Sequence, residues 1–199
     1  MKTIHHFVDG KKFSGESKNS GKVFNPATGE QIAEVKLAST KDVNQAVFAA
    51  KKAFEKWSNK PPLQRARVMF KFKELIEKNS DELTKIIVSE HGKVYEDAKG
   101  SLVRGLEVVE YACGIPQMLK GEFTENVGSS VDSWSLRQPL GVCAGVTPFN
   151  FPAMVPMWMF PMAIACGNTF VLKPSEKDPS CSMRLGELLS EAGLPDGVF

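Results

Sequence analysis

Two short, largely apolar runs near the C-terminal end determine much of how this chain can fold. Gly141–Val146 and Thr169–Lys173 have the length of β-strands and are bounded by turn signals. A helical segment between them closes at Gly167-Asn168, and a second helix is expected from Pro179-Ser180 to Gly193. A strand, a helix, a strand and a helix in this order predict an α/β fold with a parallel sheet. Because both runs are largely apolar, each strand is predicted to be buried on both faces.

The segment between the two strands is apolar enough to be mistaken for a membrane span. Phe151–Cys166 contains 16 uncharged, mostly apolar residues, among them Pro152, Pro156 and Pro161. A membrane-spanning helix needs about 20 such residues and rarely begins with so many prolines. We therefore expect a buried element that begins with proline-stiffened turns, and no contact with a membrane.

The first part of the chain is predicted to contain short strands followed by a helix. Asp9-Gly10 is a hairpin turn signal, and Asn25–Glu30 (NPATGE) is a second turn. Ser39–Asp42 fits a capping box at the start of a helix. The apolar residues that follow it recur at helical spacing: Val43, Ala46, Val47, Ala50, Phe54 and Trp57.

Three more helices are predicted before the sheet. One begins at Pro61-Pro62, and the next is expected to be capped by Ser80 and to end at His91-Gly92. The last would run from about Val94 to Gln117. The predicted inner faces are Ala66, Met69, Phe72, Leu75 and Ile76 in the first of these helices, and Leu102, Leu106, Val109 and Cys113 in the last.

The pattern changes near Leu119, and this change suggests three parts of the chain. The sequence SSVDSWSLRQP alternates loosely, which is typical of an antiparallel or edge strand. Residues 1–118 would form the N-terminal strands and helices, residues 119–140 a separate strand segment, and residues 141–199 the beginning of the parallel sheet.

Charge and cysteine content exclude several classes of function. The net charge is only +2, so nucleic acid is not an expected partner. Four separated cysteines without metal-ligand spacing indicate free thiols, and the pair His5 and His6 has no third ligand nearby. The N-terminal residues show neither a signal peptide nor an Arg-rich transit pattern. We therefore expect no metal and a cytoplasmic protein, or a mitochondrial matrix protein if the source is a eukaryote.

Ligands of open α/β sheets lie at the carboxyl ends of the strands, where this chain has two polar loops. The loop TPFNFP follows the first strand, and the loop KPSEK follows the second. A ribose diol both donates and accepts hydrogen bonds, so Lys173 and Glu176 suit it, and the carboxylate would disfavour a 2′-phosphate. Spacing alone favours a solvated charge cluster at the start of a helix. The phosphate-binding motifs GxGxxG and GxxxxGK[ST] do not occur.

Asn150 lies between two phenylalanines and two prolines in the first loop. An asparagine in such a place is often a simple turn-former. Its side-chain amide could instead donate a hydrogen bond to a developing oxyanion in a dry pocket. The residue type and its position leave both interpretations open.

Three linked motifs resemble the aldehyde dehydrogenase superfamily in order and spacing. They are TPFNFP, then MFPMAIACGNTFVLKPSEKDPS, then EAGLPDGVF. Phe149 stands where the general family pattern has Trp, and this version is most similar to the CoA-acylating methylmalonate-semialdehyde dehydrogenases. Earlier segments such as NPATGE, AFEKWS, RARVMF and EHGKVYEDAKGSLVRGLEVVEYACG fit the same branch, so the resemblance covers the whole chain.

The resemblance implies the N-terminal portion of an aldehyde-dehydrogenase-like α/β fold: strands and helices, then the start of a parallel βαβ sheet that binds NAD. Thr147 and Phe149 would line the cofactor site by backbone and ring. Lys173 and Glu176 would hold the adenosine ribose, with Lys177 beside them. The strand segment 119–140 would serve oligomerisation, and the family suggests a homotetramer.

The resemblance also implies a reaction. A cysteine thiolate attacks an aldehyde, Asn150 helps to form the oxyanion hole, hydride passes to NAD, and CoA accepts the acyl group as propionyl-CoA or acetyl-CoA. Arg104 is expected to bind the carboxylate of a methylmalonate or malonate semialdehyde. The substrates would be a small aldehyde and CoA, in valine or inositol catabolism.

One departure from the family pattern concerns the nucleophile. Cys113, Cys143, Cys166 and Cys181 do not occur in the sequence context of the family's catalytic cysteine, which comes in a later segment. We therefore expect the chain to be less than half of a family member and to be inactive by itself. Two alternatives stay open: a water-deacylating aldehyde dehydrogenase of another branch, and a truncated, non-catalytic binding module.

Overall fold

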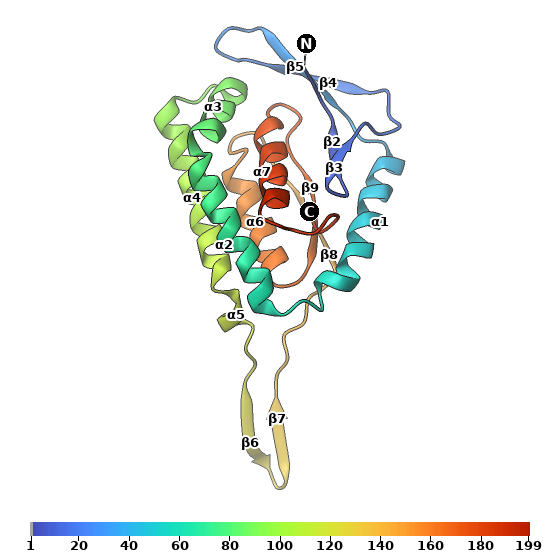
Figure 1. Cartoon of the computed structure of the whole chain (residues 1–199), viewed down its shortest axis with the longest axis vertical. Coiled ribbons are helices and arrows are strands. Elements are labelled where there is room, and N and C mark those ends of the chain that lie inside the picture. The colour runs from blue at the N-terminus through green and yellow to red at the C-terminus, as the bar shows by residue number, and fades with distance from the viewer. Residues whose placement is uncertain (1) are drawn as a thin grey trace.

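The computed structural model describes residues 2–199, and Figure 1 shows their arrangement. Short strands come first, helices follow, and a strand–helix–strand–helix unit ends the chain, as the sequence predicts. The strands are β1 (Lys2–Ile4), β2 (His6–Val8), β3 (Lys11–Phe13), β4 (Ser20–Phe24), β5 (Gln31–Lys36), β6 (Phe123–Gly128), β7 (Val131–Trp134), β8 (Val142–Val146) and β9 (Thr169–Lys173). The helices are α1 (Thr40–Trp57), α2 (Pro62–Lys78), α3 (Ser80–His91), α4 (Tyr95–Cys113), α5 (Ile115–Met118), α6 (Met154–Ala165) and α7 (Ser180–Glu191).

The two predicted N-terminal turns are confirmed. Asp9 and Gly10 have φ values of 54° and 72° and join β2 to β3 as an antiparallel hairpin. Both central residues of such a tight turn need positive φ, which favours Asp and Gly there. The turn Asn25–Glu30 is closed by a hydrogen bond from the Asn25 N–H to the Glu30 carbonyl. It joins β4 to β5 in a small sheet of order β1-β5-β4.

The capping box of α1 is confirmed, but the predicted cap of α3 is wrong. The amide of Asp42 donates to the Ser39 hydroxyl over 3.2 Å, and the Ser39 amide donates back to the Asp42 carboxylate over 2.7 Å. Ser80, in contrast, is already helical, and Asn79 occupies the cap position without a side-chain cap. Helix α2 ends at Lys78 and α3 begins at Ser80, so too little chain remains for an extended cap residue.

The predicted helix from Val94 to Gln117 is two helices. Helix α4 ends at Cys113, Gly114 caps it, and α5 covers only Ile115–Met118. Pro116 explains the break, because it has no N–H to donate to the preceding helical turn. The predicted inward positions hold: Leu102, Val109 and Cys113 are buried, and Leu106 packs against the core.

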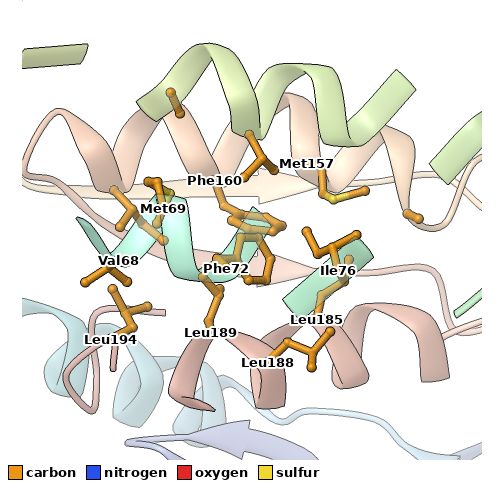
Figure 2. Close-up of a cluster of buried hydrophobic side chains, with 14 of the residues drawn as sticks. Val68, Met69, Phe72, Ile76, Met157, Phe160, Leu185, Leu188, Leu189 and Leu194 are labelled. Atoms are coloured by element: carbon orange, nitrogen blue, oxygen red, sulfur yellow. The ribbon is translucent and has the colours of Figure 1, made fainter. Parts of the chain in front are cut away.

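One hydrophobic core joins the helices before the hairpin to the strand–helix unit after it. Figure 2 shows side chains of α2, α6 and α7 meeting in this core. The ring centroids of Phe72 and Phe160 are 5.9 Å apart. The predicted inner face of α2 is confirmed, with Leu75 only partly buried. Helix α6 thereby accounts for the apolar segment, and no helix within residues 2–199 is both long and apolar enough to cross a membrane.

Two side chains from the first helices hold the C-terminal end of α6. The Trp57 indole donates to the Ile164 carbonyl over 2.9 Å, and Arg65 Nε donates to the Ala165 carbonyl over 3.0 Å. Arg65 is only 4% exposed. These bonds satisfy carbonyls that a helix end leaves unpaired, and a cation is favourable at that end. They therefore fix the helix that follows the Asn150 loop.

Strands β8 and β9 pair in parallel, but their predicted burial on both faces is wrong. Val142 is 36% exposed and Val146 is 76% exposed. The exposed face borders a cavity of about 510 Å³ between the sheet, helix α1 and the β2–β3 hairpin. Val43 and Val47 of α1 line the same cavity, so this predicted helix face is only partly covered.

The segment predicted as a separate strand forms a hairpin. Strands β6 and β7 pair antiparallel and project from the body of the molecule (Figure 1). Sequence patterning identified β7 and missed β6, because β6 lacks alternating apolar residues. Every residue of both strands is exposed.

Candidate active site at the carboxyl ends of β8 and β9

The two loops predicted to lie on one rim of the sheet are in contact. Each follows a strand of the parallel pair β8–β9, so both leave the sheet at the same edge. The Lys177 ammonium lies 4.4 Å from the centroid of the Phe149 ring, within the range of a cation–π interaction. This contact joins the TPFNFP loop to the KPSEK loop.

The predicted ribose-binding pair is an ion pair at this rim. Lys173 Nζ lies 2.9 Å from Glu176 Oε2, and the two side chains are 58% and 50% exposed. The hydrogen bond from Lys173 lowers the pKa of Glu176, so this carboxylate is charged at neutral pH. An exposed pair of this kind contributes little to stability and is accessible to a ligand.

Asn150 and Thr147 have different environments in the same loop. Asn150 is exposed, and within residues 2–199 its amide makes no hydrogen bond. Thr147 is buried, and its backbone N–H donates to the Lys173 carbonyl over 3.1 Å. A cofactor contact by the Thr147 backbone would therefore use its carbonyl oxygen.

A third segment reaches the TPFNFP loop, and sequence reasoning missed it. Glu90–Lys93 ends helix α3, far from the loops in sequence. The His91 and Phe149 ring centroids are 6.4 Å apart, and the Lys93 ammonium lies 4.2 Å from the Phe151 centroid. The only sequence signal in this segment is the His91-Gly92 helix end, which predicts a turn and says nothing about its neighbours.

One buried and one partly buried carboxyl group, those of Asp178 and Glu90, lie near each other beneath the KPSEK loop. Asp178 is 2% exposed, and neither of its carboxyl oxygens has a hydrogen-bond partner among the described residues. Burial raises the pKa of Asp178 to about 7, and the nearby Glu90 carboxylate adds to the rise. The pKa of Glu90 is also raised by burial, although its carboxylate accepts a hydrogen bond from the Ser180 amide over 2.9 Å.

These carboxyl groups make the stability of the chain depend on pH. At a pH below the unfolded-state pKa of Asp178, the carboxyl group is protonated in both the folded and the unfolded chain. As the pH rises toward the folded-state pKa of about 7, only the folded chain keeps this proton. Stability should therefore fall between about pH 4 and pH 7. We expect Asp178→Asn to match the parent near pH 4 and to exceed its stability by about 2 kcal/mol near pH 8.

Urea unfolding across this pH range measures the effect. Asp97→Asn on the exposed side of α4 is the matched control. It keeps Asp178, so its stability should fall with pH in the same way as that of the parent. A stability difference between Asp178→Asn and the parent that is the same at every pH would contradict the assignment.

Arg104 lies on α4, next to the helix that follows the Asn150 loop. It is exposed and has no ion-pair partner in the part of the chain that the structure describes. Its neighbour Gly105 packs against α6 so closely that an added Cβ would lie 2.3 Å from Met157 Cε and 3.2 Å from Met154 Cα. The Arg104 backbone is therefore held near the beginning of α6, with its guanidinium free.

The four cysteines have the environment of structural thiols. All are free, Cys113 and Cys181 are buried, and the other two are partly buried. Burial raises the pKa of Cys113, Cys166 and Cys181, which disfavours the reactive thiolate. Cys143 is part of β8 and packs against the core. Within residues 2–199, no group of three or more His, Cys, Asp or Glu side chains is arranged to hold a metal.

Sequence comparison relates the whole chain to known enzymes. The malonate-semialdehyde dehydrogenase of Pseudomonas aeruginosa is 55% identical over 199 residues, which are 100% of this chain and 40% of that protein. The acylating, mitochondrial methylmalonate-semialdehyde dehydrogenase of Arabidopsis thaliana is 52% identical over 196 residues, which are 98% of this chain and 32% of that protein. The chain thus spans well under half the length of these relatives.

Solved structures agree with the sequence comparison. A methylmalonate-semialdehyde dehydrogenase from Oceanimonas doudoroffii is 61% identical and superposes with a TM-score of 0.97. A putative methylmalonate-semialdehyde dehydrogenase from Sinorhizobium meliloti, complexed with NAD, is 54% identical and also has a TM-score of 0.97. Each match covers 100% of this chain and 40% of the other. The sequence model of the aldehyde dehydrogenase family matches residues 13–199. Because this match covers nearly the whole chain, the chain belongs to the aldehyde dehydrogenase family.

Proposed function

We propose that this chain is the N-terminal, NAD-binding part of a CoA-acylating semialdehyde dehydrogenase. The whole enzyme would oxidise methylmalonate or malonate semialdehyde and release propionyl-CoA or acetyl-CoA. The observation that carries the proposal is the contact of Lys177 with Phe149, which brings the Asn150 loop and the Lys173–Glu176 pair to one rim. The substrate is suggested by the names of the P. aeruginosa and A. thaliana relatives, and acyl transfer by the word acylating in the name of the latter. CoA as the acyl acceptor is part of our proposal.

The residues at the rim fit the ribose end of NAD. Lys173 offers hydrogen-bond donors and Glu176 offers a hydrogen-bond acceptor, and a ribose diol requires both. Both residues border the cavity beside β8 and β9. The cavity volume of about 510 Å³ lies within the range of small-molecule sites. Its walls include apolar residues such as Val146 and Val171, while Lys173 and Glu176 add polar groups.

The residues of the proposed site would divide cofactor binding and catalysis between them. Lys173 and Glu176 would bind the ribose, with Lys177 beside them, and Thr147 and Phe149 would line the cofactor by carbonyl and ring. Asn150 would donate a hydrogen bond to the oxygen of the aldehyde as negative charge develops there. NAD, when bound, accepts a hydride. The attacking thiolate would come from a cysteine other than the four described above.

We further propose that the whole enzyme is a homotetramer assembled through the β6–β7 hairpin. An exposed, projecting hairpin with large apolar side chains is suited to pairing with another copy. The apolar side chains that it exposes are Phe123, Val127, Val131 and Trp134.

A product assay tests the proposed function. In the whole protein we expect NADH formation from methylmalonate semialdehyde together with a CoA thioester, and no free acid as the main product. Free acid with or without CoA would instead indicate a water-deacylating enzyme. Residues 1–199 alone should form no NADH, since no thiohemiacetal forms without a thiolate. CoA-dependent turnover by residues 1–199 would contradict this division of roles.

Glu176 is expected to determine the choice of cofactor. Its carboxylate would repel the 2′-phosphate of NADP, and Glu176→Gln removes that charge. We expect Glu176→Gln to weaken NAD binding and to raise the NADP/NAD ratio of kcat/KM by roughly 10-fold. Steady-state kinetics with both cofactors measure this ratio. Glu187→Gln, which removes a partly exposed carboxylate from α7, is the matched control. An unchanged ratio would remove Glu176 from the cofactor site.

A further inference from the structure

The loop that carries Asn150 has few hydrogen bonds to hold it. Pro148 and Pro152 have no N–H, and within the described residues no hydrogen bond reaches Asn150 itself. After Asn150, the Phe151 carbonyl accepts a hydrogen bond from the Val155 N–H and the Pro152 carbonyl accepts one from the Ser182 hydroxyl, each over 3.2 Å. Two aromatic rings, one on each side of Asn150, add further contacts. Each ring lies against an ammonium group: Phe149 against Lys177 at 4.4 Å and Phe151 against Lys93 at 4.2 Å.

Lys93 belongs to a turn that the fold holds in one conformation. Gly92, directly before it, has a φ of 84°, which favours glycine. A Cβ on Gly92 would lie 2.6 Å from Pro26 Cγ, so the turn Asn25–Glu30 packs closely against this position. The chain is thereby turned so that His91 contacts Phe149 while Lys93 contacts Phe151.

His91 is suited to this arrangement because it is uncharged. Its pKa is lowered by burial and by the Lys93 ammonium, so at neutral pH the imidazole is neutral and does not repel Lys93. The Phe149 ring therefore contacts the neutral His91 ring and the Lys177 ammonium. The half-buried Lys93 contacts the ring of Phe151 without repulsion from His91.

We propose that Lys93 is a positioning residue for Asn150 and acts through the ring of Phe151. This inference rests on the proposed role of Asn150 as the hydrogen-bond donor to the aldehyde oxygen. Lys93 touches no reacting atom. Its ammonium holds Phe151, and Phe151 together with the Lys177-bound Phe149 fixes the backbone on both sides of Asn150. The amide is thereby oriented before the substrate arrives.

Four variants of the whole protein test this role in pre-steady-state assays. Lys93→Met keeps the apolar stem and removes the cation, and we expect acylation to slow by roughly 10-fold with NAD affinity unchanged. Lys93→Arg keeps a cation that can lie on the ring and should restore most of the rate. Lys60→Met removes the ammonium 5.8 Å from the Trp57 ring, remote from the loops, and should leave the rate unchanged. Asn150→Ala reports on the donor itself.

Double variants distinguish positioning from general stabilisation. If Lys93 acts through Asn150, then adding Lys93→Met to Asn150→Ala should cause little further loss. Lys93→Met should likewise have little effect on the acylation rate once Phe151→Leu has removed the ring. The comparison of Phe151→Leu with the double variant still tests the role of Lys93 if Lys93→Met alone folds poorly.

The outcomes separate this inference from the proposed function. A large loss with Asn150→Ala and none with Lys93→Met, or fully additive losses, would overturn the positioning role alone. No loss with Asn150→Ala would overturn the proposed function of the site.

Discussion

Replacing Asn150 by Ala in the whole enzyme should slow acylation by roughly 100- to 1000-fold, equivalent to about 3–4 kcal/mol of transition-state stabilisation. The expected loss is large because a positioned amide donor stabilises charge that exists only in the transition state. NAD affinity should change little, because the proposed ribose contacts are made by Lys173 and Glu176 in the other loop. The measurement is the pre-steady-state burst of NADH.

Two further variants sharpen this test. Asn150→Asp has nearly the same shape, but its carboxylate cannot donate a hydrogen bond and would repel an oxyanion, so it should be at least as slow as Asn150→Ala. Asn44→Ala replaces an exposed asparagine on α1 and should leave the burst unchanged. A loss of less than about fivefold in Asn150→Ala would return Asn150 to the simpler role of a turn-former.

Local signals in the sequence predicted the elements of the fold well. The hairpin at Asp9-Gly10, the Ser39–Asp42 capping box and strand Thr169–Lys173 depend on residues that are adjacent or a few positions apart. Such signals require no knowledge of the rest of the molecule. Two of the errors occurred where local signals competed. A serine between two helices resembled a cap at Ser80, and apolar periodicity continued through the break before Pro116.

The candidate site was predicted only in part, for a physical reason. Two consecutive parallel strands must end at the same edge, so the meeting of their loops followed from the strand order. The contacts of Lys93 and His91 with the TPFNFP loop could not be predicted in the same way, because they depend on how α3 packs and on the contact of Gly92 with Pro26. The burial of Asp178 was also missed, since charged residues are seldom buried and nothing in the sequence marks this one.

Arg104→Leu should raise the KM for methylmalonate semialdehyde by roughly 100-fold while leaving propanal oxidation nearly unchanged. Both proposed semialdehydes carry a carboxylate, which an arginine can bind through two parallel hydrogen bonds. The structure supplies a suitable arginine. Arg104 is exposed and has no carboxylate partner among residues 2–199, and the adjacent Gly105 holds the backbone against the beginning of α6.

A structural role and a binding role for Arg104 predict different kinetics. If the side chain only stabilised the fold, its loss would affect both aldehydes equally. If it binds the substrate carboxylate, only the semialdehyde loses an interaction, and the effect is in KM because the carboxylate is bound equally in the ground state and the transition state. Lys99→Leu, which also removes an exposed cation from α4, is the matched control and should affect neither substrate.

The form of the arginine side chain provides a final test of this assignment. Arg104→Lys keeps the positive charge but replaces the planar fork with a single ammonium. It should therefore recover only part of the affinity, with a KM between those of the parent and Arg104→Leu. Full recovery by lysine would show that charge alone is needed, and equal losses on propanal and the semialdehyde would place Arg104 outside the substrate site.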